Sequence, residues 1–216
     1  MNSFKAFQEI RKQRNNFLYS AKIILRFLII RFKSNSRIYA HSSFRISGLK
    51  NIEASDLWLG IHYRGFENSS DIGKLNIQGK LICPGEFKIG KGSRISVDKG
   101  AIVALGKYGY INSNTQIIIS EGLTIGDRCA IAWNCQFLDN DFHELSIDGV
   151  FRKKSAPISI GDHVWIGSNV KIYKGVKIPS NCVVASDSVV KGVFEEENCL
   201  IAGNPAKIVR RNISWR

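Results

Sequence analysis

The apolar positions of this chain recur every sixth residue over most of its length. From residue 160 onward a large aliphatic side chain occupies each sixth position, and shorter runs with the same spacing lie earlier. A period of six fits neither the two-residue alternation of an isolated strand nor the 3.6-residue repeat of an amphipathic helix. The apolar anchors of the repeat are Ile77, Cys83, Ile89, Ile95, Leu105, Ile111, Ile117, Leu123, Ile125, Ile131, Phe137, Ile160, Ile166, Ile172, Ile178, Val184 and Val190.

Such a period predicts an all-β solenoid over residues 38–200. One six-residue side holds a short strand and a corner, three sides close a triangular coil of about 18 residues, and coils stack at ~4.8 Å. The anchor fills the interior, and the residue four positions later is small and lies near a corner. Ile46, Ile52 and Trp58 are the expected anchors of an opening coil.

The register of the repeat also assigns the cysteines. Cys129, Cys135 and Cys182 occupy the small inward position and Cys83 a large inward one, so we expect core residues. The five cysteines include no CxxC pair and no spacing typical of zinc ligands, and we expect no metal. An odd number of cysteines without an export signal is typical of a reducing cytoplasm.

Residues 1–37 form a separate basic and apolar segment. Residues 17–32 read FLYSAKIILRFLIIRF, a run too often interrupted by cations to span a membrane, and no signal-peptide cleavage site follows it. At helical spacing the expected apolar face consists of Phe17, Ala21, Ile24 and Leu28, and the neighbouring cationic face of Lys22, Arg26 and Lys33. Two interpretations stay open: this amphipathic helix lies on an anionic membrane, or it packs on the protein's own body or a sister subunit.

The distribution of charge also separates residues 1–37 from the rest of the chain. The 31 Lys and Arg residues against 18 Asp and Glu give a net charge of +13, of which residues 1–37 carry +8 and the remainder +5. A hydrophobic fraction of 44% excludes a disordered chain, and five cysteines are too few for a disulfide scaffold. Because most of the charge lies in one segment and no groove-reading motif is visible, a nucleic-acid partner is not expected.

The repeat has one long interruption, between Phe137 and Ile160, which are 23 residues apart instead of six. We therefore expect a loop extruded from the solenoid at about residues 139–157. Insertions of this kind lie on one face of a solenoid and often line its binding site.

The loop opens with DNDFHEL and contains His143, one of four histidines. Its acidic neighbours are Asp139, Asp141 and Glu144. A carboxylate bonded to one ring nitrogen makes an imidazole a better base near neutral pH. His143 is therefore either a general base in a binding loop or a solvated loop histidine.

Residues 201–216 form a basic C-terminal tail. It contains Lys207, Arg210, Arg211 and Arg216, and no acidic residue follows Glu197. Such a cluster at the end of a solenoid either holds phosphate groups or is solvated.

Three segments resemble the hexapeptide-repeat acyltransferases, in particular the branch of sugar and polysaccharide O-acetyltransferases. They are IGDHVWIGSNVKIYKGVKIP at residues 160–179, the DxDxH segment at residues 139–143 and AGNPAKIVRR at residues 202–211. The resemblance extends over about residues 70–210. It implies a left-handed parallel β-helix, acetyl-CoA as the acyl donor and a homotrimer with the coenzyme between neighbouring prisms.

The resemblance also implies roles for individual residues. His143 matches the catalytic histidine, which takes the proton of the acceptor hydroxyl, and Asn112 matches an asparagine that positions the reacting groups. Trp165 matches a tryptophan lining the channel where the thiol arm meets the acceptor. Expected coenzyme contacts are Ser168 and Ser186 for the pantetheine arm and Lys191, Lys207 and Arg210 for the phosphates, while Asp139, Asp141 and Glu144 form the substrate loop.

One departure bears on the acceptor. Ser120 stands where the sugar acetyltransferases have an acidic acceptor contact, which argues against a small galactoside or maltose as the substrate.

The expected activity is direct acetyl transfer from acetyl-CoA to a sugar hydroxyl of a cell-surface polysaccharide, as in capsule or O-antigen modification, or of its lipid-linked precursor. The basic segment would bring a cytoplasmic enzyme to the inner face of the membrane. Alternatives are N-acetylation of an amino sugar, acetylation of an antibiotic or serine, and a non-catalytic scaffold or binding solenoid. A β-helix carbonic anhydrase is disfavoured because His41, His62, His143 and His163 are scattered and form no metal-ligand pair.

Overall fold

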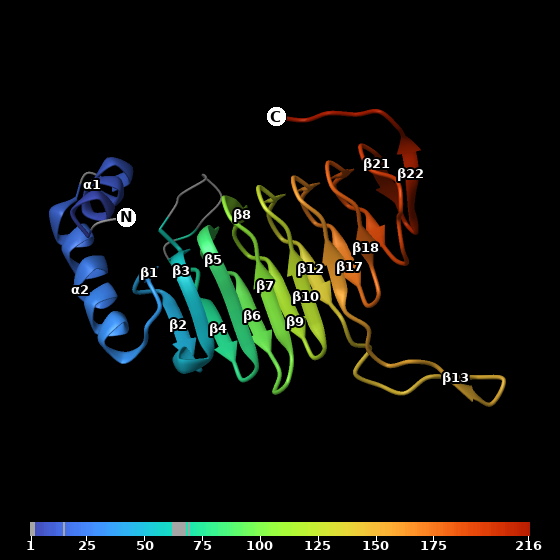
Figure 1. The fold of residues 1–216 in the computed structure, drawn as a ribbon, viewed down its shortest axis with the longest axis horizontal. Helices are drawn as coiled ribbons and strands as arrows, with labels where there is room; N and C mark the ends of the chain where they lie inside the picture. Colours follow the sequence, from blue (N-terminus) through green and yellow to red (C-terminus); the bar gives the residue numbers. More distant parts are fainter. Residues whose placement is uncertain (1–2, 15, 62–67, 69) are drawn as a thin grey trace.

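The computed structural model describes residues 3–14, 16–61, 68 and 70–216, and its strands form a three-sided prism (Figure 1). A thirteen-stranded sheet bends around one edge and supplies two faces, and a seven-stranded sheet supplies the third. Neighbouring strands within the prism are parallel, apart from the last pair. The predicted parallel β-helix is therefore confirmed.

Each coil passes in turn through three faces, which we number in chain order. Face 1 comprises the first halves of β3 (Ile52–Leu59) and β5 (Lys80–Ile89), with β7 (Ile102–Leu105), β10 (Gly122–Ile125), β15 (Ile158–Ile160) and β18 (Lys177–Ile178). Face 2 comprises β1 (Ile38–Ala40), the second halves of β3 and β5, β8 (Gly109–Ile111), β11 (Ala130–Ile131), β16 (Trp165–Ile166), β19 (Val183–Val184) and β21 (Leu200–Gly203). Face 3 comprises β2 (Phe44–Ser47), β4 (Gly73–Ile77), β6 (Arg94–Val97), β9 (Gln116–Ile119), β12 (Gln136–Leu138), β17 (Lys171–Tyr173) and β20 (Val189–Val190).

The remaining elements lie outside these faces. They are the helices α1 (Ser3–Arg14) and α2 (Phe17–Lys33), the short 3-10 helix η1 (Leu49–Asn51), the hairpin strands β13 (Ser146–Ile147) and β14 (Val150–Phe151), and the final strand β22 (Ala206–Arg210). The N-terminal segment thus contains two helices where the sequence predicted one.

Coil length varies along the prism. Arg94 pairs with Gln116, 22 residues later, and Gln116 pairs with Gln136, 20 residues later. Only towards the C-terminus does the spacing reach the predicted 18 residues, as between Ser159 and Lys177. The edges absorb the extra residues, so the apolar anchors still point inward.

The prism interior is one continuous apolar core. The anchors from Ile77 to Val190 are 0–2% exposed, and all five cysteines are buried among them, including Cys199, which the repeat did not assign. Burial raises the pKa of the Cys83 thiol to about 12 and those of Cys129 and Cys135 to about 11. These thiols are held protonated, as expected for core residues.

The opening coil differs from the prediction at Trp58. The register between β3 and β5 shifts between Ala54 and Asp56, where β5 contains one residue more than β3, so the two-residue alternation of β3 moves by one position at this edge of the prism. Leu57 and Leu59 therefore point into the prism, and Trp58 points outward on face 2. A six-residue repeat does not predict a register shift of one residue at an edge of the prism.

The outward Trp58 is covered by α2. The ring of Tyr39 stacks between Trp58 and Phe27 of the helix, with centroids 4.4 Å apart in both pairs. Ile23 and Ile30 of the helix are also buried, so the helix packs on the protein's own body through this face.

Of the four residues predicted for the apolar face of the helix, Ala21 and Ile24 are half-buried and Ile24 packs on the cluster around Trp58, whereas the other two are exposed. Phe17 and Leu28 of that face are 62% and 52% exposed, because the buried face is rotated to Ile23, Phe27 and Ile30. Arg26, expected on a cationic surface, is half-buried and donates to the carbonyl oxygens of His41 and Phe44. In the described part of the chain, no helix combines the length and apolar character needed to cross a membrane.

The C-terminal residues pack on the solenoid and do not form a fully solvated tail. β21 and β22 form an antiparallel pair on the last coil, and the residues after β22 turn back along face 2. At the opposite end, the helices lie against the first coil (Figure 1).

Candidate active site

The predicted loop leaves face 3 after β12 and returns to face 1 at β15. Its root is Asp139, whose fully buried carboxylate accepts the backbone N–H groups of residues 120–122 at 2.7–2.8 Å. Farther out, Asp141 forms an ion pair with Lys174. The tip, built from β13 and β14, projects well beyond the prism (Figure 1). Asp139 and Asp141 therefore hold the loop in place.

His143 lies on this loop, beyond the root. Phe142 before it adopts a positive φ of 62°, and its N–H donates to Asn140 Oδ1 at 2.6 Å in a tight turn. The His143 side chain is exposed and makes no hydrogen bond to any described residue, and Glu144 is exposed beside it. Neither Asp139 nor Asp141 orients the imidazole within one chain.

A pocket on face 2 contains Asn112 and Trp165. It has a volume of about 300 Å³, and its lining comprises Tyr110, Asn112, Ala130, Ala132, Trp133, Trp165, Trp215 and Arg216. Ala130 pairs with Tyr110 on one side and with Trp165 on the other, so a small side chain lies between two large ones on successive coils. This alternation creates a hollow with aromatic walls and few polar groups, a composition typical of small-molecule sites.

The C-terminal residues complete the pocket. Trp215 stacks on His163 with ring centroids 4.1 Å apart, and its Nε1–H donates to the His163 carbonyl oxygen at 3.0 Å. The Trp215 ring is 6.1 Å from that of Trp165. No periodic signal predicts this contact, because residues 211–216 lie beyond the repeat and their basic character indicates only solvation or phosphate binding.

Ser168 and Ser186 lie one above the other at the edge between faces 2 and 3. The Ser168 N–H donates to Ser186 Oγ at 3.1 Å. Gly167 permits this close stacking, because a Cβ there would come within 2.5 Å of the Ser186 nitrogen. Asn169, next to Ser168, donates its backbone N–H to the carbonyl oxygen of Trp133 at 2.9 Å. Because Trp133 lines the aromatic pocket, the two serines adjoin that pocket.

The predicted phosphate-binding cations are dispersed. Lys191 follows β20 at the edge between faces 3 and 1, with its ammonium group 5.6 Å from the centre of the Tyr173 ring. Lys207 and Arg210 are exposed on β22. Arg211 instead binds Glu196 through two hydrogen bonds of 2.6 and 3.0 Å, which lower the pKa of Glu196 and raise that of Arg211.

Within one chain the predicted site residues therefore form two groups. His143 and Lys191 belong to the edge between faces 3 and 1, whereas Asn112, Ser168 and Ser186 belong to the edge between faces 2 and 3. His143 does not line the pocket that holds Asn112 and Trp165.

Ser120 lies beside the root of the loop. Its N–H donates to Asp139, and its hydroxyl donates to Asp98 Oδ2 at 2.6 Å. An acidic group thus lies next to Ser120, on the preceding coil.

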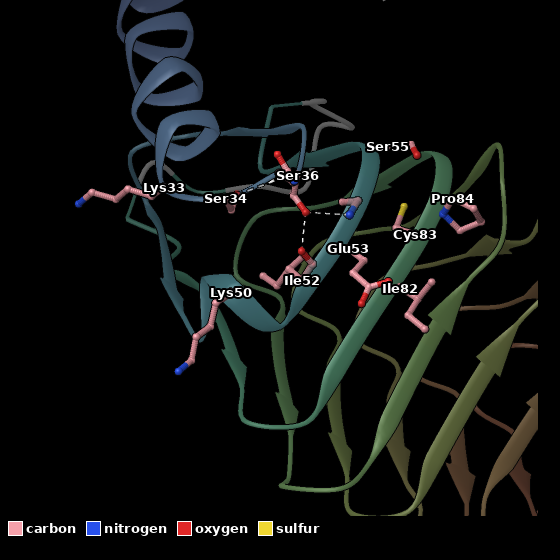
Figure 2. Close-up of a pocket in the computed structure, with 12 residues that line it drawn as sticks. Lys33, Ser34, Ser36, Lys50, Ile52, Glu53, Ser55, Ile82, Cys83 and Pro84 are labelled. Atoms are coloured by element: carbon pink, nitrogen blue, oxygen red, sulfur yellow. Dashed lines mark hydrogen bonds between the residues drawn. The ribbon is translucent and has the colours of Figure 1, made fainter.

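A second cavity, of about 580 Å³, lies between the end of α2 and the first coil (Figure 2). Here Ser36 Oγ donates to the carbonyl oxygen of Ile52 and accepts the N–H of Ala54 at 2.9 Å. Lys33 and Lys50 point away from the other lining residues. Ser36 thus forms hydrogen bonds with backbone groups at the start of β3. The charged side chains of Lys33 and Lys50 do not converge in this cavity.

The histidines and acidic residues show no metal cluster within the described residues. His41 bonds Ser43 through Nδ1 at 2.7 Å, and His163 bonds Asn181 at 3.1 Å. His62 lies outside the described residues.

Comparison with known proteins defines the class of this β-helix. The family model for the bacterial transferase hexapeptide (six repeats) matches residues 157–192. A 24.8 kDa protein of the cps region of Klebsiella pneumoniae is 37% identical over 197 residues, which cover 90% of this chain and 88% of the relative. The chain belongs to the hexapeptide-repeat acyltransferase family, whose β-helix is left-handed.

Two further proteins extend the comparison. A polysialic acid O-acetyltransferase of Escherichia coli O1:K1 is 36% identical over 137 residues, which cover 59% of this chain but only 44% of the relative. The crystal structure of the polySia-specific acetyltransferase NeuO has the same fold, with a TM-score of 0.54 and 24% identity over 85% of this chain and 79% of that one.

Proposed function

We propose that the protein transfers the acetyl group of acetyl-CoA to a sugar hydroxyl of a cell-surface polysaccharide or of its lipid-linked precursor. The observation that carries this proposal is the aromatic pocket holding Asn112 and Trp165 on face 2 of an acyltransferase-family β-helix. The relatives support the acceptor class, because one is a polysialic acid O-acetyltransferase and another is a protein of a cps region.

In the proposed reaction His143 is the general base. Its imidazole accepts the proton of the acceptor hydroxyl while that oxygen attacks the thioester carbonyl carbon. The C–S bond then breaks, and the imidazolium returns the proton to the leaving thiolate, which gives an O-acetyl ester and free coenzyme A. A positioned base of this kind contributes about 10²–10⁴-fold to the rate. The buried, protonated core cysteines support direct transfer without an acyl-enzyme.

The proposed site is shared between copies of the chain in a homotrimer. His143 and Lys191 lie on one edge of the prism, and the pocket with Asn112 and Trp165 lies on another face. A neighbouring copy that presents its loop to this face would complete the site. The pantetheine arm would follow Ser168 and Ser186, with the exposed cations Lys191, Lys207 and Arg210 available to the coenzyme phosphates.

His143→Ala tests the proposal. We expect turnover to fall by two or more orders of magnitude, because the base is lost, while the KM for acetyl-CoA changes by less than about twofold. The measurement is thiol release from acetyl-CoA with a panel of acceptor glycans, with mass spectrometry of the acetylated product. His41→Ala, a histidine of the first coil, is the matched control. Unchanged turnover in His143→Ala would contradict the assignment.

We also propose that α2 holds the enzyme at the inner face of the membrane. The helix surface opposite its buried face carries Leu18, Leu25 and Phe32, which are 69%, 61% and 93% exposed. Lys22 and Lys33 flank them, and α2 contains no acidic residue. Apolar side chains bordered by cations fit the interface of an anionic bilayer.

A further inference from the structure

Face 3 carries a column of polar residues along the prism. The same register position on six successive strands is occupied by Arg45, Lys74, Arg94, Gln116, Gln136 and Lys171. Strands stack at ~4.8 Å, so the column extends for about 24 Å. Four of its six members are cations.

These side chains point to solvent. Arg45, Lys74, Arg94 and Lys171 are exposed, while the residue that follows each of the last three is buried in the prism core. No carboxylate of the described residues forms an ion pair with the four cations. The strands of face 3 contain neither Asp nor Glu. The column is therefore an uncompensated line of positive charge.

A second column runs beside the first. Ser47 donates to Asn76 Oδ1 at 3.0 Å, and the Asn76 amide donates to Ser96 Oγ at 3.2 Å. A shallow cavity of about 250 Å³ lies over both columns, lined among others by Lys74 and Arg94. The surface thus combines cations with amide and hydroxyl groups around a shallow hollow, and the second column continues with Ile118 and Leu138.

We propose that face 3 binds an anionic polysaccharide chain that lies along the prism axis. Such a chain carries regularly spaced negative charges, which match the cation column, and many hydroxyl groups, which match the amide and serine side chains. The 139–157 loop leaves the prism from β12 of this same face. This inference rests on the proposed function and refines it, because the bound polymer lies beside the root of the loop that carries His143.

A nucleic acid fits this surface less well. Single-stranded nucleic acids bind through bases stacked on aromatic rings. The outward residues of face 3 from β2 to β12 include no aromatic side chain, and Tyr173 of β17 comes only at the end of the column. Hydrogen-bonding and aliphatic side chains, such as Asn76 and Ile118, take the places where stacking rings would be needed.

The test measures polymer binding by the full-length protein in its own oligomeric state. The probes are fluorescently labelled polysialic acid and polygalacturonate, with neutral dextran and single-stranded DNA of similar length for comparison. We expect both anionic glycans to bind more tightly than dextran and DNA. Their affinity falls as salt rises, because exposed charges are screened.

Lys74→Gln/Arg94→Gln removes two charges from the middle of the column. Exposed charge pairs each contribute modestly, so we expect about tenfold weaker binding of the anionic glycans, which corresponds to about 1.4 kcal/mol. Lys80→Gln/Lys177→Gln removes the same charge from exposed positions on face 1 and should stay within about twofold of the wild type. Thermal unfolding of each variant verifies that the fold is intact.

The possible outcomes separate this inference from the proposed function. Equal affinity for dextran, tighter binding of DNA, or equal losses in the two double variants would overturn the polysaccharide site. Acetyl transfer by the wild type is followed in parallel. A chain that transfers no acetyl group but loses glycan binding only with Lys74→Gln/Arg94→Gln refutes the proposed activity and supports the binding face.

Discussion

Asp139 controls where the 139–157 loop leaves the prism. The sequence placed this residue in a substrate loop because it stands four positions before His143. Its carboxylate is instead buried and saturated by three backbone N–H groups. A buried structural carboxylate and an exposed functional one look the same in a sequence, since only the partners distinguish them.

Asp139→Ala should lower the free energy of unfolding by about 2–4 kcal/mol, because three buried N–H groups lose their acceptor. Urea denaturation measures this change. Glu195→Ala, which removes an exposed carboxylate, should shift the midpoint by much less. A loss of activity in Asp139→Ala without any loss of stability would point to a direct role in the reaction.

Other residues show the same division between what the repeat predicts and what it does not. The inward anchors and core cysteines follow from the six-residue period, because the period determines which side chains face the interior. Trp215 lies outside the repeat, and only the folded chain brings it to His163 and Trp165.

Among the elements, α2 shows the limit of a helical pattern. Its residues are apolar on more than one side, so spacing alone did not decide which face is buried. The answer depends on the register shift between β3 and β5, after which Trp58 points outward to meet Tyr39 and Phe27. The buried face of the helix is therefore the one that meets the outward aromatic residues of the first coils.

Lys22→Gln/Lys33→Gln tests the exposed face of this helix. We expect the wild type to sediment with vesicles of mixed anionic and zwitterionic lipid and the variant to bind about tenfold or more weakly, because each cation near the surface contributes about 1 kcal/mol. Neutral vesicles should bind both proteins poorly. Lys80→Gln/Lys177→Gln is the charge-matched control, and equal loss in both variants would attribute binding to overall charge.

At the scale of the whole molecule, the separation of His143 from Asn112 allows a test by subunit mixing. In the proposed homotrimer, assemblies containing only His143→Ala or only Asn112→Ala chains are expected to be inactive. If each site takes one residue from each of two neighbours, randomly mixed trimers retain about a quarter of the sites intact. Co-expression and assay of the mixed protein measure this recovery. Absence of any recovery would assign both residues to the same chain.

The two ends of the prism are closed differently. Helix α2 packs on the first coil, and β22 runs antiparallel to β21 on the last. The first and last coils of a β-helix present open backbone groups on which another strand can pair. These terminal elements cover such edges, so they limit the assembly to a discrete particle. Loss of either would favour end-to-end polymerisation of the enzyme into filaments.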